Sequence, residues 1–296
     1  MTNRKDVIQR LEAEAADVDR VYEKPTTQMR LVLRRFRGRR SGMIGLGIVA
    51  FLILIAILAP VLAPYEPNEI LIGKEDVGRY DPPCVHIFGC DGDRPQHIMG
   101  IDGNVRDEFS RLIYGSRVSL TLGFFTVTLA LVVGSSLGAI AGYRGGWLDN
   151  IIMRLMDVIL GFPSLLLAIA IVAVLGRGLQ NALLAIAVVT MPGYARVMRA
   201  QVLAIKESDF VAASRALGAS GFQILVRRII PNAMTPLVVL ATLGIATAIL
   251  EAAGLSFLGL GAQPPTAEWG TMLASERNQV FTAPHLVFFP GLAIMI

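Results

Sequence analysis

Two cysteines and two histidines lie close together in one polar segment, and their side chains are suited to covalent or metal chemistry. Cys84 and Cys90 could form a local disulfide, remain free thiols, or bind zinc together with His86 and His97. The spacing fits no common zinc site, and an oxidising compartment would favour the disulfide. We therefore favour a disulfide between Cys84 and Cys90 and expect no metal site.

Patterns for catalysis or nucleotide binding are missing from the sequence. No G-x-x-x-x-G-K-[ST] phosphate loop occurs, and the sole Gly-Lys pair, Gly73-Lys74, lies in the same polar segment. None of the three histidines lies at the centre of a complete apolar run, which argues against an intramembrane enzyme. We expect no catalytic site and no cofactor in this chain.

Long apolar runs dominate the rest of the chain. The 296-residue chain is 54% apolar and 17% charged, whereas soluble domains carry about 25% charged residues. Its mean hydropathy is +0.58. A helix needs about 20 mostly apolar residues to cross a bilayer, and five runs qualify: 41–64, 118–142, 151–175, 179–198 and 233–250. A sixth begins near His285 and stops at Ile296 after about half that length. The sequence thus predicts an all-α, polytopic membrane protein with about six spans.

Charge placement predicts the orientation, because lysine and arginine gather in cytoplasmic loops. Residues 34–40 contain five arginines and no acid, while residues 65–116 carry five basic side chains against ten acidic ones. An arginine run could bind nucleic acid, but its position against an uncharged span favours a membrane anchor. We expect residues 1–40 in the cytoplasm, 41–64 as the first span, 65–116 outside, and the basic 200–232 loop in the cytoplasm.

The sequence argues against two kinds of polytopic membrane protein, an ion-gradient carrier and a channel. A carrier driven by an ion gradient would need ionisable residues near the membrane centre. The five complete runs carry none there, and Asp157, the nearest, is expected close to the inner surface. A channel agrees with the composition but does not explain the 204–237 segment described below.

Three glycines repeat at four-residue spacing in the second span: Gly134, Gly138 and Gly142. Small residues on one stripe let helix backbones approach closely. The stripe could serve packing within the chain, which we favour, or an interface with another subunit.

Residues 204–237 read as two short helices joined at a glycine. Residues 209–217 form helix readily, with Asp209 as an expected N-cap. Gly218 offers a left-handed turn, and a second apolar and basic stretch, 222–230, runs to Pro231 at the start of the fifth span. Two helices and a glycine on the inner face of a membrane protein would make a rigid protrusion. A motor protein that binds this protrusion could move the membrane spans through it.

This segment resembles the EAA coupling loop of ABC-importer permeases, whose pattern is Glu-Ala-Ala, three residues, Gly, and a later Leu-Pro. The matching residues are Ala212-Ala213-Ser214, Arg215-Ala216-Leu217, Gly218 and Ile230-Pro231. Ala212 stands at the Glu position, so the ion pair that the family makes there is in question.

Further stretches resemble the second permease subunit of the dipeptide, oligopeptide and nickel importers. GIDGNVRDEFSRLIYGSRVSL, 100–120, is similar to the family's Gly-Thr-Asp-x-x-Gly-Arg-Asp, with Asn104 where a Gly is usual. LSFLGLGAQPPTAEWGTML, 255–273, is a near match over a long string, and the LAPYEPN exit of the first span, 62–68, matches loosely. The 77–99 insertion is outside the pattern.

The resemblance implies a type I ABC-importer permease in a bacterial inner membrane, with residues 117–296 as its core and the last helix incomplete. It implies a sister permease, two ATP-binding subunits that bind ATP and magnesium, and an extracytoplasmic binding protein that delivers di- or oligopeptides. Nickel or another small solute is the alternative cargo. The coupling residues it implies are Ala212, Ala213, Ser214, Arg215, Leu217, Gly218, Phe222 and Pro231.

Overall fold

The computed structural model describes residues 40–296, so most of the predicted basic anchor lies outside the described residues. Every regular element within them is a helix. The long helices are α3 (Arg40–Leu62), α4 (Glu108–Arg144), α5 (Gly146–Leu160), α6 (Ser164–Leu175), α7 (Leu179–Ile205), α10 (Ile230–Phe257) and α12 (His285–Met295). Three helices are short: α8 (Asp209–Ala216), α9 (Gly221–Ile224) and α11 (Trp269–Glu276).

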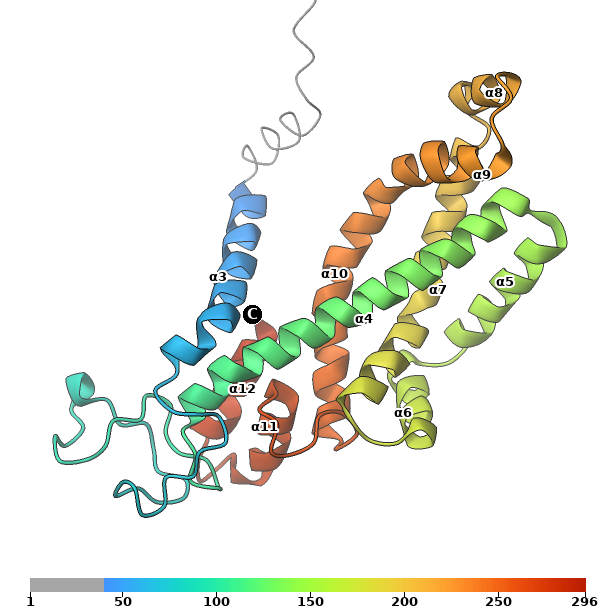
Figure 1. Ribbon diagram of the computed structural model, residues 1–296. Coiled ribbons are helices and arrows are strands. Elements are labelled where there is room, and N and C mark those ends of the chain that lie inside the picture. The colour runs from blue at the N-terminus through green and yellow to red at the C-terminus, as the bar shows by residue number, and fades with distance from the viewer. Residues whose placement is uncertain (1–39) are drawn as a thin grey trace, which may run out of the picture. The chain divides into compact units, whose positions relative to one another are not determined.

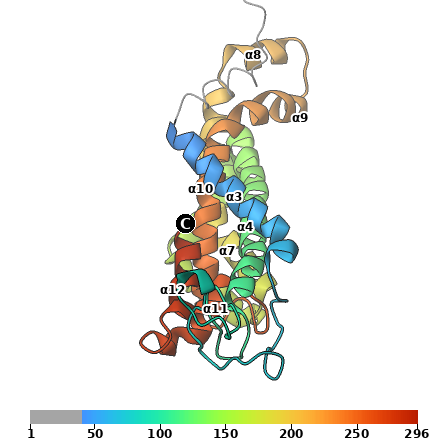
Figure 2. The ribbon, with the colours of Figure 1, turned by 90° about the vertical axis from the view of Figure 1, so that its left-hand side faces the viewer.

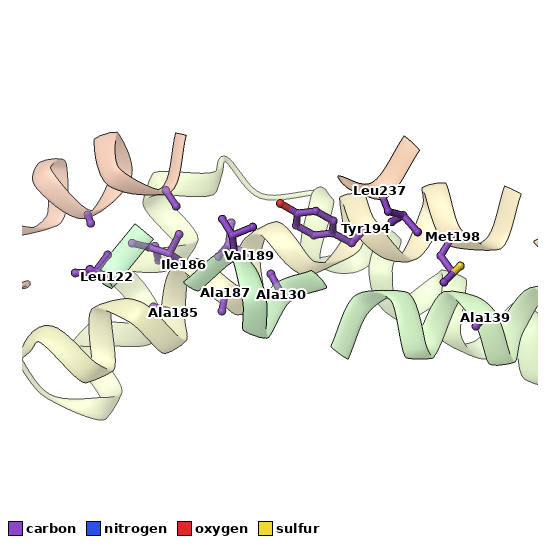
Figure 3. Packing of buried hydrophobic residues seen from close by; sticks show 14 of the residues in the cluster. Leu122, Ala130, Ala139, Ala185, Ile186, Ala187, Val189, Tyr194, Met198 and Leu237 are labelled. Carbon is purple, nitrogen blue, oxygen red and sulfur yellow. The ribbon is translucent and has the colours of Figure 1, made fainter. Parts of the chain in front are cut away.

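The chain divides into two compact units, Met1–Leu52 and Ile53–Ile296, and α3 runs through the boundary between them. Within the second unit, α4, α7 and α10 lie side by side (Figures 1 and 2). One buried cluster joins these three helices, and Figure 3 shows Ala130, Ile186 and Leu237 among its members. The cluster forms the core on which the remaining helices pack.

The glycine stripe of α4 is where this helix meets α7. A Cβ added at Gly134 would lie 2.5 Å from the carbonyl oxygen of Met191, and one at Gly138 would collide with that of Ala195. One turn further, a Cβ at Gly142 would lie 2.9 Å from a carbonyl oxygen of α7. Because only a residue without Cβ allows this approach, the structure supports the interpretation of the stripe as packing within the chain.

Four of the described helices or helical stretches are long and apolar enough to cross a membrane: Met43–Leu62, Glu108–Arg144, Leu179–Ile205 and Gly221–Phe257. The predicted third span, 151–175, is wrong as a continuous helix, because α5 and α6 meet at 95°. Gly161 follows α5, and Pro163 precedes α6. A proline lacks a backbone N–H and disfavours helix at the residue before it, so the helix breaks there.

The fifth span is longer than predicted. Its helical stretch begins at Gly221, passes through a π-helical turn, η2 (Leu225–Ile229), and continues past Pro231 without a break. At the other end α10 reaches Phe257, so Glu251 lies inside the helix and not beyond it. One carboxylate oxygen of Glu251 is buried and has no hydrogen-bond partner among the described residues. The predicted span ends too early because an acidic residue ordinarily limits an apolar run, whereas α10 carries Glu251 within the helix.

Residues 63–107, here called the cap, pack at the Glu108 end of α4. Cys84 and Cys90 are joined by a disulfide, with Cα atoms 5.4 Å apart. The sulfurs are therefore bonded to each other, and no cluster of metal-ligating side chains is found in residues 40–296. The zinc interpretation is wrong, and the insertion is pinned covalently.

Two motifs far apart in the sequence meet in the cap. The Tyr65 backbone N–H donates to Ser110 Oγ at 3.2 Å, and Arg111 Nη1 donates to the Pro67 carbonyl oxygen at 2.7 Å. The exit of α3 is thus tied to the first turn of α4, where Asp107 accepts from the Ser110 N–H and caps the helix.

A buried carboxylate organises the turn before α4. Asp102 accepts from the backbone N–H groups of Asn104 and Arg106, each at 2.9 Å, and pairs with the Arg106 guanidinium at 2.7 Å. The left-handed residue of this turn is Val105, with φ of 59°. The glycine position of the motif is therefore occupied by Val105, and the assignment of that position to Asn104 is wrong by one residue.

Candidate functional site

The segment between α7 and α10 folds as a helix–turn–helix, here called the knob (residues 206–229). It lies at the Arg144 end of α4, opposite to the cap and α11 (Figures 1 and 2). Helix α8 begins at Asp209 after Ser208, so Ser208 and not Asp209 is the N-cap residue. The Ser208 hydroxyl donates to the Ile205 carbonyl oxygen at 2.6 Å, and so links the knob to the end of α7.

Gly218 ends α8 in the left-handed conformation that the sequence predicts, with φ of 83°. The Ala219 N–H donates to the Ser214 carbonyl oxygen at 3.1 Å, and the Gly218 N–H donates to that of Arg215 at 3.0 Å. These two bonds form a Schellman motif, which satisfies the last carbonyls of a helix. Ser220 then accepts from the Gln223 N–H at 3.3 Å and caps α9.

Buried aliphatic side chains hold the knob on the core. Val211, Ile224 and Ile229 are at most 1% exposed and belong to the main hydrophobic cluster. A Cβ added at Gly221 would lie 3.0 Å from the Tyr143 hydroxyl near the end of α4. The knob is therefore packed against α4 and is not a loose loop.

Large apolar side chains nevertheless point away from the chain at the tip of the knob. Leu217 is 87% exposed and Phe222 is 77% exposed. Ala212, Ala213 and Arg215 are exposed on α8 as well. An exposed apolar patch on a packed scaffold is typical of a surface that binds another protein, and backbone bonds rather than side chains fix its shape.

A hollow of about 370 Å³ lies between the two arms of the knob. Ser214 and Leu217 line it, and so do Gln223, Arg227 and Arg228, which sequence reasoning had not assigned to the site. The arginines were assigned only to the charge balance of the loop. Their position within the second apolar and basic helical stretch, 222–230, was the signal that could have placed them here.

The structure does not bring every expected coupling residue together. Ala212, Ala213, Arg215 and Phe222 surround the tip without lining the hollow. Pro231 lies in the first turn of α10, exposed, beyond the π-helical turn. Proline lacks the N–H that the preceding turn could accept, so its place where the π-helical turn passes into α10 agrees with a local structural role.

His97 and Asp107 are buried in the cap and form a polar group with the partly exposed Glu75. His97 Nδ1 lies 2.8 Å from Asp107 Oδ1, and His97 Nε2 lies 3.1 Å from Glu75 Oε2. Burial acts to lower the pKa of His97, but the hydrogen bonds and charges of Asp107 and Glu75 outweigh it and raise the pKa. Burial and the bond to Glu75 likewise raise the pKa of the Tyr65 hydroxyl. These groups bind one another, which suits a structural latch.

Comparison with protein families gives two matches. Residues 134–296 match the family described as binding-protein-dependent transport system inner membrane component. Residues 27–83 match the N-terminal transmembrane domain of oligopeptide transport permease C. The first match contains the glycine stripe, the broken helix pair and the whole knob.

Curated relatives align over nearly the whole chain. A dipeptide transport system permease protein of Alkalihalophilus pseudofirmus is 45% identical over 90% of this chain and 83% of its own length. A di/tripeptide transport system permease protein of Pseudomonas aeruginosa is 42% identical over 96% and 90%, respectively. A glutathione transport system permease protein of Escherichia coli is 43% identical over 89% and 82%.

Among solved structures, a chain of the MetNI methionine ABC transporter in an inward-facing conformation aligns with a TM-score of 0.52 and 21% identity. The alignment covers 62% of this chain and 88% of that one. This likeness concerns the fold, which is that of a type I importer permease. The chain belongs to the family of binding-protein-dependent transport system inner membrane components.

Proposed function

We propose that this chain is one of two permease subunits in an ATP-driven importer of di- and oligopeptides, located in a bacterial inner membrane. In this arrangement the cap lies outside and receives a substrate-binding protein, while the knob lies in the cytoplasm. Two partner ATPases bind ATP and magnesium there and act on the knob. The chain itself carries no catalytic site.

The observation that carries the proposal is the knob. It presents Leu217 and Phe222 to a partner on a scaffold that is packed against α4. A transporter whose sequence has no phosphate loop must receive work through a surface contact. The coupling residues proposed for that contact are Ala212, Ala213, Ser214, Arg215, Leu217, Gly218 and Phe222.

Peptide is the favoured cargo because relatives of 42–45% identity are named as dipeptide or di/tripeptide permeases. A relative of similar identity is named for glutathione, itself a tripeptide. Nickel or another small solute is the alternative within the same class.

Uptake by the purified complex in proteoliposomes tests the proposal. With binding protein and ATP present, a radiolabelled dipeptide should accumulate, and excess unlabelled di- or tripeptide should abolish the signal. Omission of ATP or of the binding protein should do the same. Labelled nickel that accumulates under these conditions, with no peptide uptake, would contradict the proposed cargo.

A further inference from the structure

A hollow of about 260 Å³ opens on the side of the helix core, halfway along α7 and α10. Most of its lining is apolar, with three hydroxyl groups among the side chains. Its wall includes Leu160, Thr190, Gly193, Tyr194, Leu243 and Thr247.

The Tyr194 side chain is buried among the core residues (Figure 3). Tyr194 and Gly244 both line the hollow, and the Tyr194 hydroxyl lies against Gly244. Within the described residues, no hydrogen bond reaches that hydroxyl. Thr190 donates to the Ile186 carbonyl oxygen at 2.8 Å, and Thr247 donates to that of Gly244 at 2.9 Å. The threonine oxygens keep lone pairs free, so the wall offers polar contacts to a molecule in the hollow.

An exposed ion pair borders the same hollow. Arg196 Nη2 lies 2.6 Å from Asp157 Oδ1, and the two side chains are 53% and 60% exposed. Gly193 and Leu160, which line the hollow, are each three residues from a member of this pair. Residues three apart share a helix face, so the pair lies one turn beyond the hollow on both α5 and α7.

This face is poorly suited to lipid. Asp157 and Arg196 lie on apolar helices that belong to membrane-spanning segments by length and composition. Ionised side chains on such helices are costly when they face hydrocarbon and normally face water or protein. The hollow and the ion pair therefore belong to a surface that meets water or another protein and not lipid.

A second ion pair shows that this one is not needed to hold α5 on α7. Arg199 Nε and Nη2 lie 2.5 and 2.6 Å from the two carboxylate oxygens of Asp149. The side chains of Arg199 and Asp149 are 35% and 12% exposed, so this pair is more buried than the Asp157–Arg196 pair. The bidentate geometry is that of a structural link, whereas an exposed pair contributes little stability and separates at little cost.

We propose that the hollow and the Asp157–Arg196 pair form this chain's part of the peptide path, with the pair as exchangeable contacts for the charged ends of the peptide. Asp157 binds the ammonium group and Arg196 the carboxylate, while the apolar wall and Tyr194 receive the side chains and the peptide bond. This inference rests on the proposed function and gives it a location.

Two neutral variants, Asp157→Asn and Arg196→Gln, test the contact in the reconstituted complex. Loss of one charge-assisted hydrogen bond should lower peptide uptake about 10-fold while the binding-protein-stimulated ATPase rate stays close to wild type. Arg177→Gln is the matched control, because Arg177 is exposed in the connection that precedes α7, far from the hollow in the sequence of this helix. This variant should leave both rates unchanged. Equal loss of uptake, hydrolysis and abundance in Asp157→Asn would overturn the inference.

The double reversal Asp157→Arg with Arg196→Asp separates a substrate contact from a structural link. A structural pair would be rebuilt, so wild-type uptake in this variant would also overturn the inference. Persistent loss of uptake is the expected result.

Water access to the hollow is a second readout that does not depend on the cargo. The structure contains no free cysteine in residues 40–296, so Leu243→Cys adds a unique thiol on the wall. A charged thiol reagent should label it during ATP turnover, and failure to label would contradict the location. If the wild-type complex moves no peptide, the proposed function fails, whereas this labelling still decides whether the hollow faces water.

Discussion

Val105 adopts a left-handed backbone conformation that β-branched residues avoid, and it does so in the turn that starts α4. Its side chain is 2% exposed and packs with Leu71 and Ile101. The Leu71 N–H donates to the Val105 carbonyl oxygen at 2.9 Å. The residue therefore combines favourable burial with a conformational strain of about 1–3 kcal/mol.

These two effects predict an unusual order of stability among variants. Val105→Ala loses about 1.5 kcal/mol of burial and keeps most of the strain. Val105→Gly loses slightly more burial but removes the strain, which offsets the entropy that glycine costs, about 0.5–1 kcal/mol. The Gly variant should be at least as stable as the Ala variant. Protease cleavage within the cap, measured in membrane vesicles, gives the comparison.

Ile101 is the matched control, because it is fully buried in the same small cluster and has no positive φ. At this position the Gly variant should be the less stable one. The cap should be about 0.5–1 kcal/mol less stable in Ile101→Gly than in Ile101→Ala. The same order at both positions would show that Val105 carries no strain.

Single residues were predictable from sequence where the signal was local. Gly218 has the positive φ that a helix-ending glycine suggests, and Cys84 and Cys90 are bonded. The contacts of Asp102 and the carboxylate of Glu251 were missed. The Asp102 contacts depend on a turn whose left-handed residue is not a glycine. The burial of the Glu251 carboxylate depends on how far α10 extends, which the local sequence does not indicate.

At the scale of elements, one histidine with a raised pKa contributes to the link between the cap and α4. His97 lies between Asp107, the N-cap of α4, and Glu75 of the cap. Tyr65, which follows α3, donates to the other oxygen of Glu75 at 2.9 Å. Other charges near Tyr65 and Glu75 come from Glu69 and its partner Lys74. When His97 is protonated, its positive charge offsets a surplus of negative charge.

The raised pKa of His97 makes this link dependent on pH. A group whose pKa is higher in the folded state stabilises the fold below its ordinary pKa, about 6.5, and this contribution is lost as pH rises through the folded-state value. Cap cleavage by protease should increase between pH 6 and pH 9. His97→Gln should cost about 3 kcal/mol at pH 6 and remove most of the pH dependence.

His86 provides the control for this prediction. It lies in the same insertion, is exposed, and bonds to the Arg94 carbonyl oxygen at 2.8 Å. His86→Gln should leave the pH profile of cap cleavage unchanged. A wild-type cap that becomes more resistant as pH rises would show that the latch works in the opposite sense.

Helices could be predicted from the sequence where a long apolar run marks them. Four of the long helical stretches coincide with predicted spans. The bend between α5 and α6 was missed, because residues 151–175 are apolar on both sides of Pro163 and hydropathy does not report direction. Gly161 and Pro163 were the local signs of that break.

At the scale of the whole second unit, the packed helices α4, α7 and α10 connect the cap with the knob. The cap adjoins the Glu108 end of α4, and Tyr143 and Gly142 near its other end contact the knob. A displacement of the knob is therefore passed to helices that also line the hollow, because close-packed interiors transmit strain. In the proposed function, this continuity is the physical basis for coupling between a partner ATPase and the peptide path.

Gly218 is the residue at which that coupling can be interrupted with the least effect on the fold. A Cβ added there would meet no described atom within 4 Å, so its cost within the chain is the strain of a positive φ, about 1–3 kcal/mol for valine. Gly73 has a similar φ, 76°, and equally open surroundings in the cap. Gly73→Val thus imposes the same strain at the opposite end of α4, and Gly218→Asn keeps the turn, because asparagine tolerates this conformation.

The most direct measurement records binding-protein-stimulated ATP hydrolysis and peptide uptake together in the reconstituted complex. In Gly218→Val, the complex should assemble and uptake per ATP hydrolysed should fall about 10-fold or more, the equivalent of about 1.4 kcal/mol of lost coupling. Gly73→Val should keep the wild-type ratio. Normal stimulated hydrolysis together with normal uptake in Gly218→Val would contradict the claim that this knob transmits the work of a partner ATPase.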